Sequence, residues 1–188
     1  MTLAWDTTAP LHAARADRSE VLHASAGTER RHVATSPVMA ELAEAGVTPP
    51  GWLETVDQGD DPELAIAYLV SFARWQTRLG SDPAAGHDIG EADTLAWSET
   101  FGAIALIDDQ DARTAARTAL PPDASWCVHG SLWAISRDVV EQRSTPQGLS
   151  GFCDAMLRTG IRWPFQMGDY PRWFARNRKQ LDTTCCQP

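Results

Sequence analysis

Hydrophobic residues in the middle of the chain recur three and four positions apart, the spacing that gathers them on one face of an α-helix. The clearest case is residues 62–79, where Leu64, Tyr68, Phe72 and Trp75 follow one another at helical steps. This spacing predicts a helix over 62–79 that turns those side chains toward a core. Shorter patterns of the same kind predict further helices within 91–107, 109–120 and 131–143.

Proline and glycine punctuate the sequence in the order that is typical of helices, with proline in the first turn and glycine just past the last. Ser36-Pro37, for example, opens a segment that Gly46 closes. Short apolar runs such as residues 126–128 do not alternate for long enough to predict strands. We therefore expect an all-α fold, a single compact domain of about six to eight helices with at most a minor β element.

The length of 188 residues is that of one domain. The apolar spacing fades at both ends of the chain, where chain termini are commonly loose. The predicted organisation is a flexible tail over 1–9, a single helical domain over 10–181 and a flexible tail over 182–188. The sequence assigns no function to Cys185 and Cys186, the adjacent thiols of the second tail.

Charge is distributed unevenly along this acidic chain, whose formal net charge is −9. Residues 36–125 hold sixteen acids against four arginines, whereas residues 126–188 hold eight bases against five acids. The acidic middle argues against nucleic-acid binding, because phosphates repel it. The apolar runs are too short to span a bilayer, and the N-terminus does not resemble a signal peptide. We expect a cytoplasmic protein that binds neither nucleic acid nor membrane.

The common cofactor motifs are missing from the sequence. It contains neither a glycine-rich dinucleotide loop nor a Gly-Lys-Ser/Thr phosphate loop. The sole lysine, Lys179, lies in a basic run near the end, whereas a lysine that forms a Schiff base is normally desolvated. We therefore expect no cofactor.

Two Glu-x-x-His units, Glu20/His23 and Glu29/His32, have the spacing that lets a carboxylate and an imidazole bind one metal from a helix. Di-iron bundles take two such units from two different helices. Here only nine residues separate the units, which leaves no room for an antiparallel return. We therefore predict that these four residues bind no metal.

The last third of the chain combines indole rings, guanidinium groups and an imidazole in a region of net positive charge. Arginine can bind a carboxylate or phosphate through two hydrogen bonds and can stack on an indole. Histidine is the side chain best suited to proton transfer near neutral pH. We predict a site with His129 as the catalytic acid or base and with these ligand-binding residues: Trp126, Trp133, Arg162, Trp163, Asp169, Tyr170, Arg172 and Trp173.

Two functions are compatible with these features, and the sequence does not determine a reaction. The last third favours a small helical enzyme, or enzyme subunit, that acts on an aromatic or carboxylate-bearing metabolite or peptide. The acidic segment 36–125 favours a non-catalytic partner protein, of immunity or accessory type, that binds a basic protein. We favour the enzyme, with a small anionic or aromatic ligand, over the protein or peptide partner.

Overall fold

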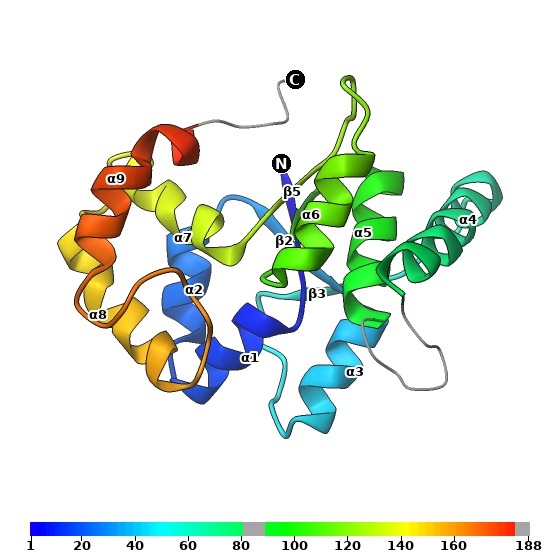
Figure 1. The fold of residues 1–188 in the computed structure, drawn as a ribbon. Helices are drawn as coiled ribbons and strands as arrows, with labels where there is room; N and C mark the ends of the chain where they lie inside the picture. The colour runs from blue at the N-terminus through cyan, green and yellow to red at the C-terminus, as the bar shows by residue number, and fades with distance from the viewer. Residues whose placement is uncertain (81–88, 183–188) are drawn as a thin grey trace.

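A five-stranded parallel sheet lies at the centre of the protein (Figure 1). The computed structural model describes residues 1–80 and 89–182. The strands are β1 (Thr2–Trp5), β2 (Arg31–Thr35), β3 (Glu54–Val56), β4 (Ile104–Leu106) and β5 (Cys127–His129), in the order β3-β2-β1-β4-β5. The prediction of an all-α fold is therefore wrong, and the protein is an α/β protein.

Helices nevertheless form most of the structure: 59% of the described residues are helical and 10% are in strands. Because helices predominate, the proline and glycine signals at helix ends are more frequent in the sequence than strand patterns are. The helices are α1 (Thr8–Arg15), α2 (Ser19–Ala26), α3 (Ser36–Glu44), α4 (Pro62–Leu79), α5 (Ile89–Phe101), α6 (Gln110–Ala119), α7 (Ser131–Val140), α8 (Pro146–Arg158) and α9 (Tyr170–Asp182).

The strands escaped prediction because they are short and buried on both faces. In β1, Leu3 and Trp5 face one core cluster, while Ala4 between them faces another. Parallel strands covered on both sides read as continuous apolar runs without alternation. The register pairs Leu3 with both His32 and Ile104, residues far away in the sequence.

Helices cover both faces of the sheet and make three layers (Figure 1). On one side of the sheet α1, α2 and α7 lie around Trp5 and Leu106, and α9 packs on α7 and α8 on α9. The other face packs against α4, α5 and α6 around Ala105, Ile107 and Val128. The strand order and the two helical layers make this a doubly wound α/β domain.

Helix α4 has the bounds that the hydrophobic spacing predicted, Pro62–Leu79. Asp61 caps its start by accepting hydrogen bonds from two backbone N–H groups, and Gly80 ends it in the left-handed conformation. Trp75 is buried as predicted, but Leu64 is 39% exposed, so the predicted core face is wrong at its first residue. Pro62, Glu63 and Leu64 at the start of α4 are exposed, and contact with α5 is present in the second turn, where the hydroxyl of Tyr68 donates to Asp93.

The structure describes all of the first predicted tail, residues 1–9, and only Asp182 of the second. Residues 1–9 include β1, the central strand, so this segment is part of the core rather than a loose tail. The thiols Cys185 and Cys186 lie outside the described residues. Within residues 1–80 and 89–182, none of the helices is both long enough and apolar enough for a membrane span.

Candidate functional site

The carboxyl ends of all five strands lie at one edge of the sheet, where the strand order also changes direction. From β1 the chain winds through β2 to β3 on one side, and β4 and β5 continue on the other. Doubly wound proteins bind ligands in the crevice at this point, between β1 and β4. Asp6 directly follows β1, and Asp108 lies two residues beyond β4. The backbone N–H of Asp6 donates to the carbonyl oxygen of Leu106 at 3.0 Å, which joins the two strand ends.

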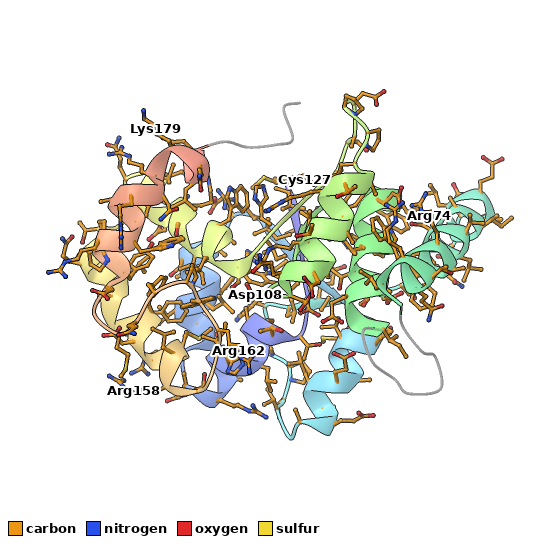
Figure 2. The ribbon with its side chains drawn as sticks, viewed as in Figure 1. Arg74, Asp108, Cys127, Arg158, Arg162 and Lys179 are labelled. Carbon is orange, nitrogen blue, oxygen red and sulfur yellow. The ribbon has the colours of Figure 1, made fainter. Side chains whose placement is uncertain are left out.

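Two cavities open at this edge, and Asp108 and Arg162 line both of them. Figure 2 shows Asp108 near the centre of the molecule and Arg162 next to α1. The first cavity, of about 310 Å³, is lined by Thr8, His12, Glu91, Asp108, Asp109, Gly160, Ile161 and Arg162. The second, of about 360 Å³, is lined by Asp108, Arg113, Arg117, Gly130, Leu132, Trp133, Arg162, Trp163, Pro164, Trp173, Asn177, Gln180 and Leu181.

Burial raises the pKa of both aspartates at the crevice. Asp6 is only 2% exposed. Burial first, and then the neighbouring carboxylates of Glu91, Glu41 and Asp108, raise its pKa well above the usual value. Burial also raises the pKa of Asp108, although hydrogen bonds from Ser131 oppose the shift. The backbone N–H of Ser131, at the start of α7, donates to Asp108 at 3.0 Å. Both carboxyl groups therefore keep their protons to a higher pH than exposed aspartates do.

The basic groups at the crevice are held in place by neighbouring elements. Burial lowers the pKa of His12, whose Nδ1 lies 2.8 Å from the hydroxyl of Thr159. Arg113 donates to the carbonyl oxygen of Ile107 at 2.7 Å, and burial lowers its pKa too. Together with Arg117 and Arg162, Arg113 gives the second cavity three guanidinium groups against one carboxylate, Asp108. This cavity therefore suits an anion.

Four of the residues predicted for the site meet around the second cavity: Trp133, Arg162, Trp163 and Trp173. His129, the predicted catalytic residue, ends β5 and stacks on Trp133 with ring centroids 4.1 Å apart. It does not itself appear in the lining of either cavity. The indole N–H groups of Trp133 and Trp163 are buried without a hydrogen-bond acceptor in the described structure. Unsatisfied buried donors of this kind are uncommon in proteins.

The other predicted site residues lie elsewhere. Trp126 packs edge-on against Trp75 in the α4–α6 layer, with ring centroids 5.9 Å apart. Tyr170 is fully buried, with its hydroxyl 3.1 Å from that of Ser136. Asp169 and Arg172 form an ion pair of 3.7 Å at the surface, and the side chain of Arg172 is 84% exposed. None of these four residues lines either cavity.

Sequence reasoning missed the acidic half of the site. Asp6 and Asp108 each come directly after a short apolar run that ends a buried strand. That repeated pattern, an apolar run closed by aspartate, was the available signal. It becomes visible only when the runs are recognised as strands. His12 and Arg113 carry no comparable signal, since their place at the crevice depends on the packing of α1 and α6.

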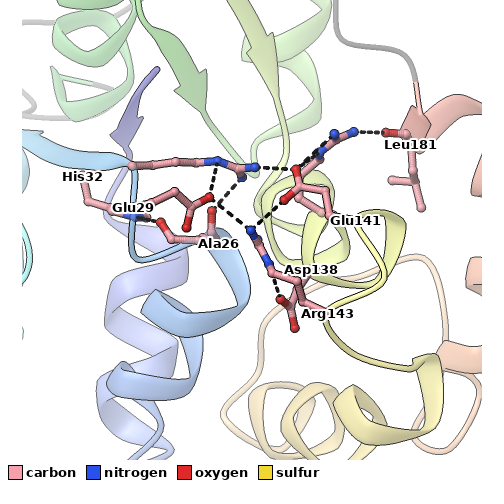
Figure 3. Close-up of polar contacts among 10 residues, drawn as sticks. Ala26, Glu29, His32, Asp138, Glu141, Arg143 and Leu181 are labelled. Atoms are coloured by element: carbon pink, nitrogen blue, oxygen red, sulfur yellow. Dashed lines mark hydrogen bonds and ion pairs between the residues drawn. The ribbon is translucent and has the colours of Figure 1, made fainter.

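The two Glu-x-x-His units occupy different kinds of structure, because Glu20 and His23 lie on α2 whereas His32 lies on β2. Figure 3 shows Glu29 in an ion-pair network that joins the α2–β2 turn to the end of α7. Trp5 Nε1 donates to Nδ1 of His32 at 3.0 Å, and His32 Nε2 lies 2.9 Å from the carbonyl oxygen of Gly27. Both ring nitrogens of His32 are therefore engaged within the fold.

Within residues 1–80 and 89–182, histidine, cysteine, aspartate and glutamate side chains form no group of three that could hold a metal ion. No protein-family model, curated protein or solved structure matches the chain. The functional argument therefore depends on the geometry of the crevice.

Proposed function

We propose that the protein is an enzyme that binds a small anionic molecule with an aromatic or other flat apolar part, at the carboxyl edge of its sheet. The observation that carries this proposal is that Asp108 and Arg162 line both cavities. Asp108, which can hold or release a proton, and Arg162, which can bind an anion, thus face the same two cavities. A cytoplasmic location is part of the proposal and agrees with the buried, reduced thiol of Cys153.

The second cavity supplies the binding chemistry. Arg162 and Arg113 offer paired N–H donors, which match the two oxygens of a carboxylate or phosphate. Trp163 and Trp173 offer apolar surface for the remainder of the ligand. Because Arg113 is half-buried, an ion pair that it forms there is less screened by water than one at the surface.

Asp108 supplies the acid–base chemistry. A carboxyl group whose pKa is raised toward neutrality exchanges protons more effectively than an exposed aspartate at the pH of the cell. Raised pKa values next to a cleft are typical of catalytic groups. In this proposal Asp108 transfers a proton to or from the bound molecule, and His129 supports the indole of Trp133 from behind.

Isothermal titration with simple probes tests the binding step. Benzoate and phenyl phosphate should bind, whereas the neutral benzyl alcohol should bind at least about tenfold more weakly, because hydrogen bonds to charged groups contribute roughly 1.5–3 kcal/mol. Arg162→Ala should weaken binding of the anionic probes by tenfold or more. Arg172→Ala is the matched control, since that side chain is exposed and lines neither cavity. Equal effects of the two substitutions would contradict the proposal.

Proton uptake during the same titrations tests the role of Asp108. An anion bound beside this carboxyl group raises its pKa further, so binding should take up protons at pH values above the ordinary aspartate range. Repeating the titration in buffers of different ionisation enthalpy measures that uptake. Asp108→Asn should abolish it, whereas His129→Gln should leave it in place. If His129→Gln alone abolishes the uptake, the acid–base role belongs to His129.

A further inference from the structure

Two hydrogen bonds in series hold the imidazole of His12, on α1, against the end of α8. The hydroxyl of Thr159 donates to the carbonyl oxygen of Met156 at 2.6 Å. The same hydroxyl oxygen lies 2.8 Å from Nδ1 of His12. A threonine hydroxyl has one hydrogen, and Met156 receives it, so towards the ring this oxygen can only accept. His12 therefore carries a proton on Nδ1.

The other ring nitrogen of His12, Nε2, has no hydrogen-bond partner among the residues that the structure describes. Burial, followed by the positive charge of Arg15, lowers the pKa of His12, while Asp108 and a backbone hydrogen bond with Thr159 oppose the shift. A histidine with a lowered pKa is neutral at neutral pH, so Nε2 keeps its lone pair. Because His12 lines the first cavity, this nitrogen is a hydrogen-bond acceptor for a ligand group bound there.

Asp108 lines the same cavity as His12 and complements it. The charged groups around this cavity are Glu91, Asp108, Asp109 and Arg162. Asp108 and His12 each influence the pKa of the other, so the two groups lie close together. An acceptor at His12, beside a carboxyl group that keeps its proton, suits a ligand group that both donates and accepts. A hydroxyl group has that property, whereas an ammonium group only donates and an ether oxygen only accepts.

We propose that the ligand of the crevice carries a hydroxyl group that donates to Nε2 of His12 and accepts from the carboxyl group of Asp108. This inference rests on the proposed function, in which the anionic part of the ligand lies in the second cavity. Asp108 and Arg162 line both cavities, so one molecule can present its anionic group to one and its hydroxyl to the other. The ligand is thus a hydroxylated acid or phosphate ester. Thr159 is a positioning residue, because its oxygen fixes which ring nitrogen carries the proton.

Isothermal titration with paired probes tests the hydroxyl contact. The meta and para isomers of hydroxybenzoate are each compared with the corresponding methoxybenzoate, which has no hydrogen to donate. At least one hydroxybenzoate should bind wild-type protein about three- to tenfold more tightly than its methoxy partner, the usual contribution of a neutral hydrogen bond. In His12→Phe the members of each pair should bind equally. His23→Phe is the matched control, because His23 lies on α2 and lines neither cavity, and it should keep the difference.

The outcomes separate this inference from the proposed function. A difference that persists in His12→Phe would overturn the inference, since it would come from the size of the methoxy group. The absence of any difference in wild-type protein that binds benzoate through Arg162 would also overturn it, and the proposed function would stand. Wild-type protein that does not bind benzoate at all would contradict both.

Nitrogen NMR of the histidine rings tests the protonation of His12 without any ligand. The His12 signals, assigned by their loss in His12→Phe, should show a protonated Nδ1 and an unprotonated Nε2 at neutral pH. Thr159→Val removes the oxygen that accepts from Nδ1 and should move part of the proton population to Nε2. Thr159→Ser keeps that oxygen and should keep the wild-type signals. Wild-type protein with its proton on Nε2, or unchanged signals in Thr159→Val, would overturn the role given to Thr159 and His12.

Discussion

Two clusters of tryptophan and histidine lie on the same side of the sheet and differ in what surrounds them. The closed cluster consists of Trp5, His23, His32 and Trp52, whose rings stack or meet edge-on with centroids 4.8–6.2 Å apart. The open cluster consists of His129, Trp133, Trp163 and Trp173, and three of its indoles line the second cavity.

The main difference between the clusters is that only the open cluster lines a charged cavity. In the closed cluster, Trp5 and His32 bond to each other and His32 also bonds to the backbone, whereas Nε1 of Trp52 has no acceptor among the described residues. In the open cluster, the N–H groups of Trp133 and Trp163 have no acceptor, and Arg162 lies beside them. The rings of the closed cluster pack on one another inside the core, whereas the indoles that line a charged cavity are available to a ligand.

Replacing one indole in each cluster should give the largest contrast. Trp5→Ala should lower the free energy of unfolding by about 3–5 kcal/mol, because it removes a fully buried ring and leaves a cavity. Trp173→Ala should cost less than half as much, since that ring is only half-buried, yet it should weaken binding of phenyl phosphate. Urea denaturation and titration calorimetry measure the two effects. A stability loss for Trp173→Ala as large as that for Trp5→Ala would remove the distinction.

His32 of the closed cluster and Asp6 at the crevice should impose opposite pH dependences on stability. Burial lowers the pKa of His32, so the unfolded chain binds more protons below about pH 6.5 and stability falls on acidification. Burial and nearby carboxylates raise the pKa of Asp6, so the folded protein keeps a proton that the unfolded chain loses, and stability falls as pH rises from about 4. Each slope is at most about 1.4 kcal/mol per pH unit.

Denaturant titrations from about pH 4 to 8 separate these contributions. Asp6→Asn should remove the loss of stability with rising pH and make the protein more stable at neutral pH. His32→Gln should remove the loss on acidification, whatever its effect on the absolute stability. Unchanged pH profiles in both variants would show that neither group titrates as its burial requires.

The smallest contrast comes from removing single N–H groups. Trp5→Phe leaves Nδ1 of His32 without its donor and should cost about 1–3 kcal/mol, the usual penalty for an unsatisfied buried polar atom. Trp133→Phe removes an N–H that has no acceptor, so it should change stability by less than half as much. Thermal unfolding of the two variants measures both losses of stability under the same conditions. A larger loss for Trp133→Phe would mean that its N–H is already satisfied, and the open cluster would then resemble the closed one.

The sequence by itself determined the features that depend on neighbours along the chain. The spacing of apolar residues predicted the bounds of α4 correctly, and Asp61 and Gly80 cap its two ends. The gathering of Trp133, Arg162, Trp163 and Trp173 was expected from the composition of the last third, and these four residues do line one cavity. Helical periodicity and capping act over a few residues, so they can be read locally.

Only the tertiary structure decided the sheet and the crevice. Strand β1 pairs with residues near position 32 on one side and near position 105 on the other, contacts that no local pattern encodes. Because its strands are covered on both faces, the sheet shows no alternation in the sequence. Asp6 and Asp108 meet only when β1 and β4 lie side by side, and their raised pKa values follow from the burial that this pairing creates.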